Sequence, residues 1–111
     1  LTVKPDHKFE ILVNGARWKM ERPILDTCEI DKRVVVIFDY MSYPKSGQAK
    51  NMVAFDMEQK ELWTAEHPTT QTNDAYVKFT GSDPLRAWNF ACYHCTLDPA
   101  TGKLLAAEFT K

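Results

Sequence analysis

Short runs of alternating hydrophobic and polar residues recur along the chain and predict half-buried β-strands. The clearest run surrounds Asn14-Gly15, a dipeptide that favours a type I′ hairpin turn because both residues accept positive φ. A two-residue turn here fixes the register of the flanking strands. It pairs Val13 with Ala16, Ile11 with Trp18, Phe9 with Met20, Glu10 with Lys19, and Lys8 with Glu21. The apolar pairs then share one face of the hairpin, and the charged pairs share the other.

Residues 33–40 are a β-branched run without alternation, which predicts a strand covered on both faces near the middle of the sheet. Further strands are expected over residues 51–56, 60–66, 75–80, 88–97 and 103–109. Polar stretches predict loops at 26–32, 41–50 and 67–74, and a turn at 82–87. No segment holds a helical period. The predicted fold is therefore all-β: an eight-stranded antiparallel meander, either a curled open sheet or a small barrel, with little or no helix.

Three predicted turns recur at a fixed spacing, because 42 residues separate Asn14 from Asp56 and again Asp56 from Asp98. Such a period is typical of repeat architectures. Residues 53–63 and 97–105 share a layout of apolar residues, an aspartate, a polar turn, a lysine and further apolar residues. Trp63 ends the first copy, and Ala106 stands in the corresponding place of the second.

This layout resembles the outer hairpin of a blade in β-propellers of the pyrroloquinoline-quinone type, over about thirty residues. The resemblance implies blade-like hairpins. A closed propeller needs about 4–8 blades, for which a chain of 111 residues is too short. Three interpretations stay open: blade-like hairpins in another all-β architecture, assembly of several chains, or similarity of the turns alone. No residue matches the family's quinone-binding positions.

Composition places the chain among ordinary globular proteins with one domain, residues 1–111. A net charge of −1 with both signs interspersed gives no basis for binding nucleic acid or an anionic membrane. No apolar run approaches the roughly 20 residues that span a bilayer, and no signal peptide is recognisable. Three cysteines are an odd number, which predicts free thiols and a cytoplasmic protein.

Candidate chemistry is concentrated at Cys92-Tyr93-His94-Cys95. Within a strand at 88–97, Cys92 and Cys95 point to opposite faces, so we expect no metal site and no cofactor. Trp88, Phe90, Cys92 and His94 share one face of that strand, whereas His7 and His67 lie in polar loops and are expected to be solvated. The candidate ligand-binding residues are His94, Cys92, Trp88, Tyr40 and Tyr43. Phosphate loops and nucleophile elbows are missing from the sequence.

These patterns favour a non-enzymatic binding or interaction module over an enzyme. Its contacts would come from the loops at 41–50 and 67–74 and from sheet edges, since loops on a rigid scaffold often carry binding. Exposed edges also predict self-association as a dimer. The partner would be a protein or a small molecule. The alternative is a small ligand-binding barrel with an internal pocket near His94. Such a barrel either only binds its ligand or is also catalytic, using His94 with Cys92 and a loop tyrosine or carboxylate.

Overall fold

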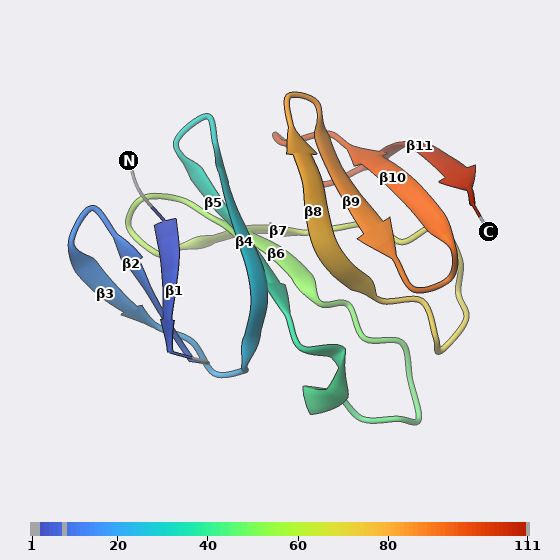
Figure 1. The fold of residues 1–111 in the computed structure, drawn as a ribbon, viewed down its shortest axis with the longest axis horizontal. Helices are drawn as coiled ribbons and strands as arrows, with labels where there is room; N and C mark the ends of the chain where they lie inside the picture. Colours follow the sequence, from blue (N-terminus) through green and yellow to red (C-terminus); the bar gives the residue numbers. More distant parts are fainter. Residues whose placement is uncertain (1–2, 8, 111) are drawn as a thin grey trace.

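The computed structural model describes residues 3–7 and 9–110, and it contains eleven β-strands in three antiparallel sheets (Figure 1). The first sheet has strands β1 (Val3–His7), β2 (Glu10–Val13) and β3 (Ala16–Lys19). The second has β4 (Ile24–Ile30), β5 (Arg33–Phe38), β6 (Met52–Phe55) and β7 (Glu61–Thr64). The third has β8 (Tyr76–Ser82), β9 (Leu85–Asn89), β10 (Tyr93–Leu97) and β11 (Leu104–Phe109). A 3₁₀ turn, η1 (Tyr40–Ser42), follows β5.

The all-β class predicted from the sequence is confirmed, but the eight-stranded meander is not. The chain folds as three consecutive small meanders, and none of them closes into a barrel within the described residues. No helix in this part of the chain is long and apolar enough to cross a membrane.

Two apolar layers lie between the three sheets, one on each side of β5. Val34, Val36 and Phe38 pack with β2 and β3 of the first sheet. Val35 and Ile37 pack toward β8, β9 and β10 of the third sheet. Since both faces of β5 are buried, the strand predicted to be covered on both sides is confirmed. The middle sheet therefore carries the core, and the outer sheets cover it.

The Asn14-Gly15 hairpin has the register predicted from the sequence. Ile11 lies opposite Trp18 and Val13 opposite Ala16, with all but Ala16 buried. Glu10 lies opposite Lys19, and its carboxylate accepts a hydrogen bond from Arg17 Nη1 at 2.9 Å. The predicted pair of Lys8 with Glu21 lies outside the described residues.

The three recurring turns occupy the same place in each sheet, between its last two strands. Asp56 Oδ1 accepts from two backbone N–H groups of its own turn, and Asp98 Oδ1 accepts from one. Each aspartate turn also contacts the last strand of the preceding sheet. Gln59 Nε2 donates to the Lys19 carbonyl at 2.9 Å, and Trp63 Nε1 donates to the Pro99 carbonyl at 3.0 Å. The period in the sequence thus corresponds to a repeated contact between sheets.

Residues 26–32, expected to be a loop, belong mostly to strand β4. Thr27 pairs with Val36 and Cys28 with Val35 across the ladder to β5. The polar residue Asp26 has a role in the sheet, because its carboxylate accepts from the Phe79 N–H of β8 at 2.9 Å. The polar residue Asp26 therefore serves a contact between the second and third sheets and does not indicate a loop.

Residues 88–97, expected to be one strand, are divided by a tight turn between β9 and β10. Cys92 has φ of 71°, and its N–H donates to the Asn89 carbonyl at 3.0 Å. The Asn89 side-chain oxygen accepts from the Ala91 N–H, so an asparagine supplies the turn without glycine or proline. Cys92 and His94 therefore do not share one strand face. The turn predicted at 82–87 is also shorter, since β9 begins at Leu85.

Candidate functional site

The two long loops before β6 and after β7 meet and line an open pocket of about 470 Å³. Gln48 joins them, because its Nε2 donates to the Thr69 carbonyl at 2.8 Å. The pocket is mostly apolar. Its lining residues are Tyr40, Met41, Tyr43, Pro44, Lys45, Gly47, Ala49, Thr72, Asn73, Ala75 and Phe90. We call it the loop pocket; it brings together the segments 41–50 and 67–74 that the sequence singled out.

Aromatic side chains form the walls of the loop pocket. Tyr40 and Phe90 meet edge to face with ring centroids 5.1 Å apart, in the geometry that aromatic pairs prefer. The Asp39 carboxylate caps η1 by accepting from the Met41 N–H at 2.9 Å, which fixes the start of the first loop. Met41 is 65% exposed and Phe90 is 50% exposed, so apolar surface remains open to a ligand.

Tyr43 also lines the loop pocket and is held from the other side by Arg22, whose guanidinium carbon lies 3.9 Å from the ring centroid. Arg22 Nη1 donates to the Ser42 carbonyl at 2.8 Å. Burial raises the pKa of Tyr43, against the opposing effect of the Arg22 charge, so the phenol stays protonated at neutral pH. Tyr43 thus presents an uncharged, well-positioned aromatic ring to the loop pocket.

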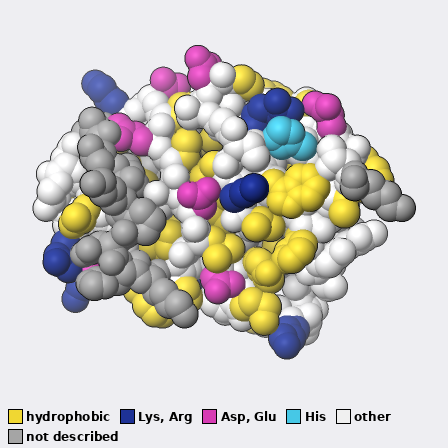
Figure 2. Space-filling view, in the orientation of Figure 1, with side chains coloured by type: hydrophobic (Ala, Val, Ile, Leu, Met, Phe, Trp, Pro, Cys, Tyr) yellow, Lys and Arg dark blue, Asp and Glu magenta, His cyan; other side chains and the backbone are white. Residues whose placement is uncertain are grey.

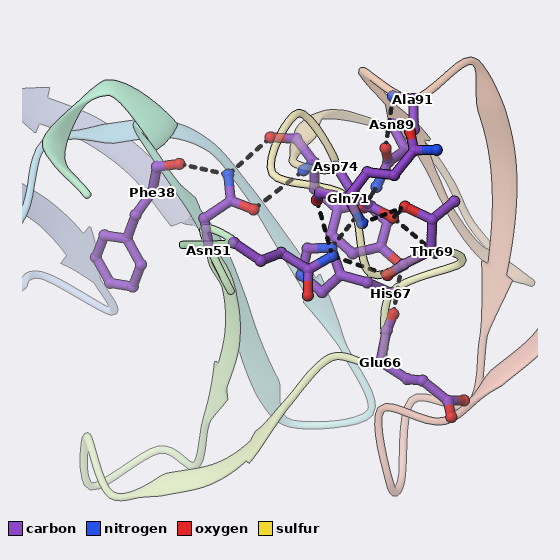
Figure 3. Close-up of polar contacts among 11 residues, drawn as sticks. Phe38, Asn51, Glu66, His67, Thr69, Gln71, Asp74, Asn89 and Ala91 are labelled. Atoms are coloured by element: carbon purple, nitrogen blue, oxygen red, sulfur yellow. Dashed lines mark hydrogen bonds and ion pairs between the residues drawn. The ribbon is translucent and has the colours of Figure 1, made fainter. Parts of the chain in front are cut away.

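A buried polar network anchors the second loop beside the pocket (Figure 3). Asp74 is fully buried and accepts from four donors: His67 Nδ1 at 2.7 Å, Thr69 N at 2.7 Å, Thr69 Oγ1 at 2.6 Å and Asn89 Nδ2 at 2.6 Å. Four partners satisfy a carboxylate in the protein interior. Asp74 therefore fixes the loop from residue 67 to residue 74 against the turn after β9.

A second buried side chain, Asn51, lies just before β6 and connects two strands, β5 and β8. Its amide donates to the carbonyls of Phe38 and Tyr76, each at 2.8 Å, and its oxygen accepts from the Tyr76 N–H at 3.0 Å (Figure 3). Tyr76 in turn donates its hydroxyl to the Glu66 carbonyl at 2.6 Å. Asn51 therefore ties the end of β5 to the start of β8.

Asp74 and His67 form a buried pair that would suggest acid–base chemistry if it were accessible. Burial raises the pKa of the Asp74 carboxyl, but hydrogen bonds from His67, Thr69 and Asn89 outweigh this effect and leave the pKa lowered. Asp74 is therefore ionised, and His67 Nδ1 carries the donated proton. The His67 side chain is only 3% exposed and does not line the loop pocket. The pair holds the loop in place, and the expectation of a solvated His67 is wrong.

His94 and Trp88 lie away from the loop pocket, on the outer face of the third sheet. With Lys78, Thr80 and Thr110 they line a shallow hollow of about 410 Å³. Arg86 Nη2 lies 3.2 Å from His94 Nδ1, and a guanidinium can only donate, so Nδ1 is the acceptor. His94 Nε2 then donates to Thr80 Oγ1 at 2.6 Å. Both ring nitrogens are occupied, which leaves neither free to act as a base.

The three cysteines are free and separate. Cys92 lies in the turn after β9, and Cys95 is buried in the layer between the second and third sheets. Burial raises the pKa of both Cys28 and Cys95 to about 11, so these thiols are protonated at neutral pH and are weak nucleophiles. Among the described residues, no three His, Cys, Asp or Glu side chains are placed to hold a metal ion.

The five candidate ligand-binding residues thus divide between three places. Tyr40 and Tyr43 line the loop pocket, Trp88 and His94 line the hollow on the third sheet, and Cys92 lines neither. Sequence reasoning missed the three fully buried polar residues Asn51, Asp74 and Asn89. Asn51 and Asp74 stand in polar stretches before a strand, where buried and solvated side chains have the same local pattern, and Asn89 ends β9 within an apolar run that was expected to continue as a strand.

The fold and site define a three-sheet β-protein with a loop-built pocket. Residues 6–109 match the family model described as a domain of unknown function, DUF7957, and the chain belongs to this family. No curated protein and no solved structure matches the chain.

Proposed function

We propose that this chain is a non-enzymatic binding module that acts through the loop pocket. The observation that supports this most is the joining of two long loops around one apolar cavity, with Gln48 and Asp74 holding them in place. Binding sites are commonly concave, mostly apolar and largely preformed. The chemistry of His67, His94 and the buried thiols offers no competing catalytic arrangement.

The lining indicates the class of ligand. Aromatic and aliphatic side chains supply most of the pocket wall. Among the described residues that line the pocket, Lys45 is the only one that is charged at neutral pH. Thr72 and Asn73 offer hydrogen bonds at the rim. This combination favours an apolar or aromatic group that carries a carboxylate, whether in a small molecule or in a protein side chain.

A titration with 3-phenylpropionate tests this proposal, with 3-phenylpropylamine as the ligand of opposite charge. We expect saturable binding of the carboxylate at roughly millimolar concentration, as for a ligand of that size, and weaker binding of the amine. Lys45→Glu should weaken carboxylate binding by about 5–10-fold, because attraction becomes repulsion. Lys50→Glu, in the same loop but outside the lining, is the matched control. Equal affinity of both ligands, or equal effects of both variants, would contradict the proposal.

We also infer that the chain self-associates as a dimer through strand β11. This strand ends its sheet, so one edge has no partner strand within the described residues. Leu105 is 64% exposed and Phe109 is 61% exposed. An exposed apolar edge favours pairing with another strand. The free thiols support the cytoplasmic location expected from the sequence.

The propeller resemblance leads to one further proposal about architecture. We infer that the three sheets are copies of a blade-like repeat used as a scaffold for the loops. The common place of the three turns, and the contact of each aspartate turn with the preceding sheet, support this.

A further inference from the structure

We propose that the loop pocket and the hollow beside His94 form one groove that binds an extended acidic peptide segment with two apolar side chains. This inference rests on the proposed function and extends it from a pocket to a surface. It commits to a peptide because each hollow combines an aromatic wall with one lysine, and two of the wall residues, Trp88 and Phe90, are only two positions apart in the chain.

Strands β8 and β9 connect the two hollows. On β9 and the turn after it, Trp88 lines the hollow and Phe90 lines the loop pocket. Along β8, Lys78 lines the hollow, and Ala75 just before this strand lines the pocket. Trp88 lies one position before the last residue of β9 and Phe90 directly follows that strand, so about 7 Å of extended chain spans the two positions. Residues i and i+2 of an extended peptide have the same separation and point the same way, so one segment can reach both sites.

Apolar surface continues between the two sites. Trp88 is partly buried, Phe90 is 50% exposed, and Tyr40 packs against Phe90 at 5.1 Å. Figure 2 shows hydrophobic side chains gathered on this face over β8 and β9, beside a histidine and Lys or Arg side chains, with Asp or Glu side chains at the margin of the patch. Aromatic residues in exposed clusters of this kind are enriched in binding surfaces.

The charges along the groove favour an acidic partner. Lys45 lines the loop pocket and Lys78 lines the hollow, and neither lining includes an aspartate or glutamate of the described residues. Glu108 lies across the ladder from His94, but its carboxylate is paired with Arg86 Nη2 at 3.4 Å. A chain with a net charge of −1 thus presents two lysines at this surface.

The peptide would lie across the face of the sheet rather than extend it as a new strand. One edge of β8 pairs with β9, and the other lies beside β4, where the Phe79 N–H donates to Asp26. Side-chain anchors and the two lysines would therefore provide the affinity.

The test uses the peptide Ac-Glu-Phe-Asp-Leu-Glu-NH2 and the ¹⁵N-labelled full chain in a titration followed by two-dimensional NMR. We expect shifts both at loop-pocket residues such as Gly47 and at the Trp88 indole N–H, with binding about 10-fold tighter than that of 3-phenylpropionate. A peptide with Lys at the three acidic positions, and one with Gly in place of Phe, should each bind at least 5-fold more weakly.

Lys78→Glu separates the groove from the pocket. It should weaken peptide binding by about 5–10-fold and leave 3-phenylpropionate binding unchanged, whereas Lys103→Glu, exposed and outside both linings, should change neither. Peptide shifts confined to the loop pocket, or no effect of Lys78→Glu, would overturn the groove and leave the pocket proposal standing. If neither the peptide nor 3-phenylpropionate binds, both proposals are wrong.

Discussion

At the scale of single residues, Asp74 contributes most to the order of the candidate site. It is fully buried, yet its carboxylate has four hydrogen-bond donors, so the cost of burying the charge is offset. The donors come from the loop that lines the pocket and from Asn89 at the end of β9. One side chain therefore couples the loop to the third sheet.

Asp74→Asn should destabilise the fold by about 2–4 kcal/mol, because one carboxylate oxygen becomes an NH2 group that faces other donors. Urea unfolding measures this loss. Asp31→Asn, at an exposed turn, is the control and should change stability by less than about 0.5 kcal/mol. Equal stability of Asp74→Asn and the unaltered chain would show that the buried carboxylate is not required.

The same carboxylate predicts a dependence of stability on acid. Its pKa is lowered in the folded state from an ordinary value of about 3.9, so its contribution is complete above about pH 4 and is lost as pH falls through the lowered pKa. Stability measured from pH 6 to pH 2 should therefore fall less steeply below pH 4 in Asp74→Asn. Parallel curves for the two proteins would contradict this assignment.

His67 shows the limit of sequence reasoning at this scale. A histidine followed by proline and polar residues has the local pattern of a solvated loop, and only the three-dimensional contact with Asp74 buries it. Tyr40 and Tyr43, by contrast, flank a loop in the sequence and line its pocket in the structure. The local sequence pattern was therefore enough to locate the loops, but not to show that His67 and Asp74 are buried and hold one of them in place.

At the scale of elements, turn chemistry decided what could be predicted. Asn14-Gly15 fixed a hairpin and its register, and the recurrence of Asp56 and Asp98 indicated two more turns. The turns at Asp31-Lys32 and Asn89–Cys92 were not predicted, because non-glycine residues with positive φ form them. Eight strands were expected instead of eleven because β1 was not predicted, β4 was taken for a loop, and β9 and β10 were merged into one strand.

Gly102 lies where the third sheet contacts the second: its carbonyl accepts from the Glu66 N–H at 2.9 Å, and it packs against Trp63. Substitution of Gly102 therefore tests the packing of these two sheets. Gly102 has φ of 75°, and an added Cβ would lie 2.4 Å from Trp63 Cε3. Gly102→Ala should cost about 2–5 kcal/mol, from backbone strain together with overpacking. Gly47→Ala, which meets nothing within 4 Å, should cost less than about 1 kcal/mol. Thermal unfolding of both variants checks the difference; equal losses would mean that the turn does not rest on Trp63.

At the scale of the whole molecule, three small sheets share two apolar layers around β5. Packing against the neighbouring sheets buries the hydrophobic faces, including both faces of β5. The sequence indicated the repeat but not the division into separate sheets. Strand patterns alone do not distinguish a continuous meander from three consecutive ones, since the hairpins are the same in both.

The geometry of the β11 edge predicts how two chains would pair in the proposed dimer. Because the Thr110 N–H donates to the Cys92 carbonyl, ladder alternation directs the backbone groups of Ala107 and Phe109 to the free edge. Two-fold antiparallel pairing centred on Ala107 would place Leu105 opposite Phe109. Ala107→Pro removes the central outward N–H and should yield a monomer, whereas Ala107→Ser should stay dimeric. Light scattering over a hundredfold concentration range measures this; a monomeric unaltered chain, or a dimeric Ala107→Pro, would contradict it.

The most direct test of the binding proposal is a residue-resolved map of where 3-phenylpropionate binds. Two-dimensional ¹H–¹⁵N NMR of the full chain supplies this map. We expect saturable shifts at backbone amides of the loop pocket, such as Gly47, Thr72 and Phe90, and at Lys45, which also lines it. Shifts spread over the surface, or centred on the β11 edge, would show that the loop pocket is not the binding site.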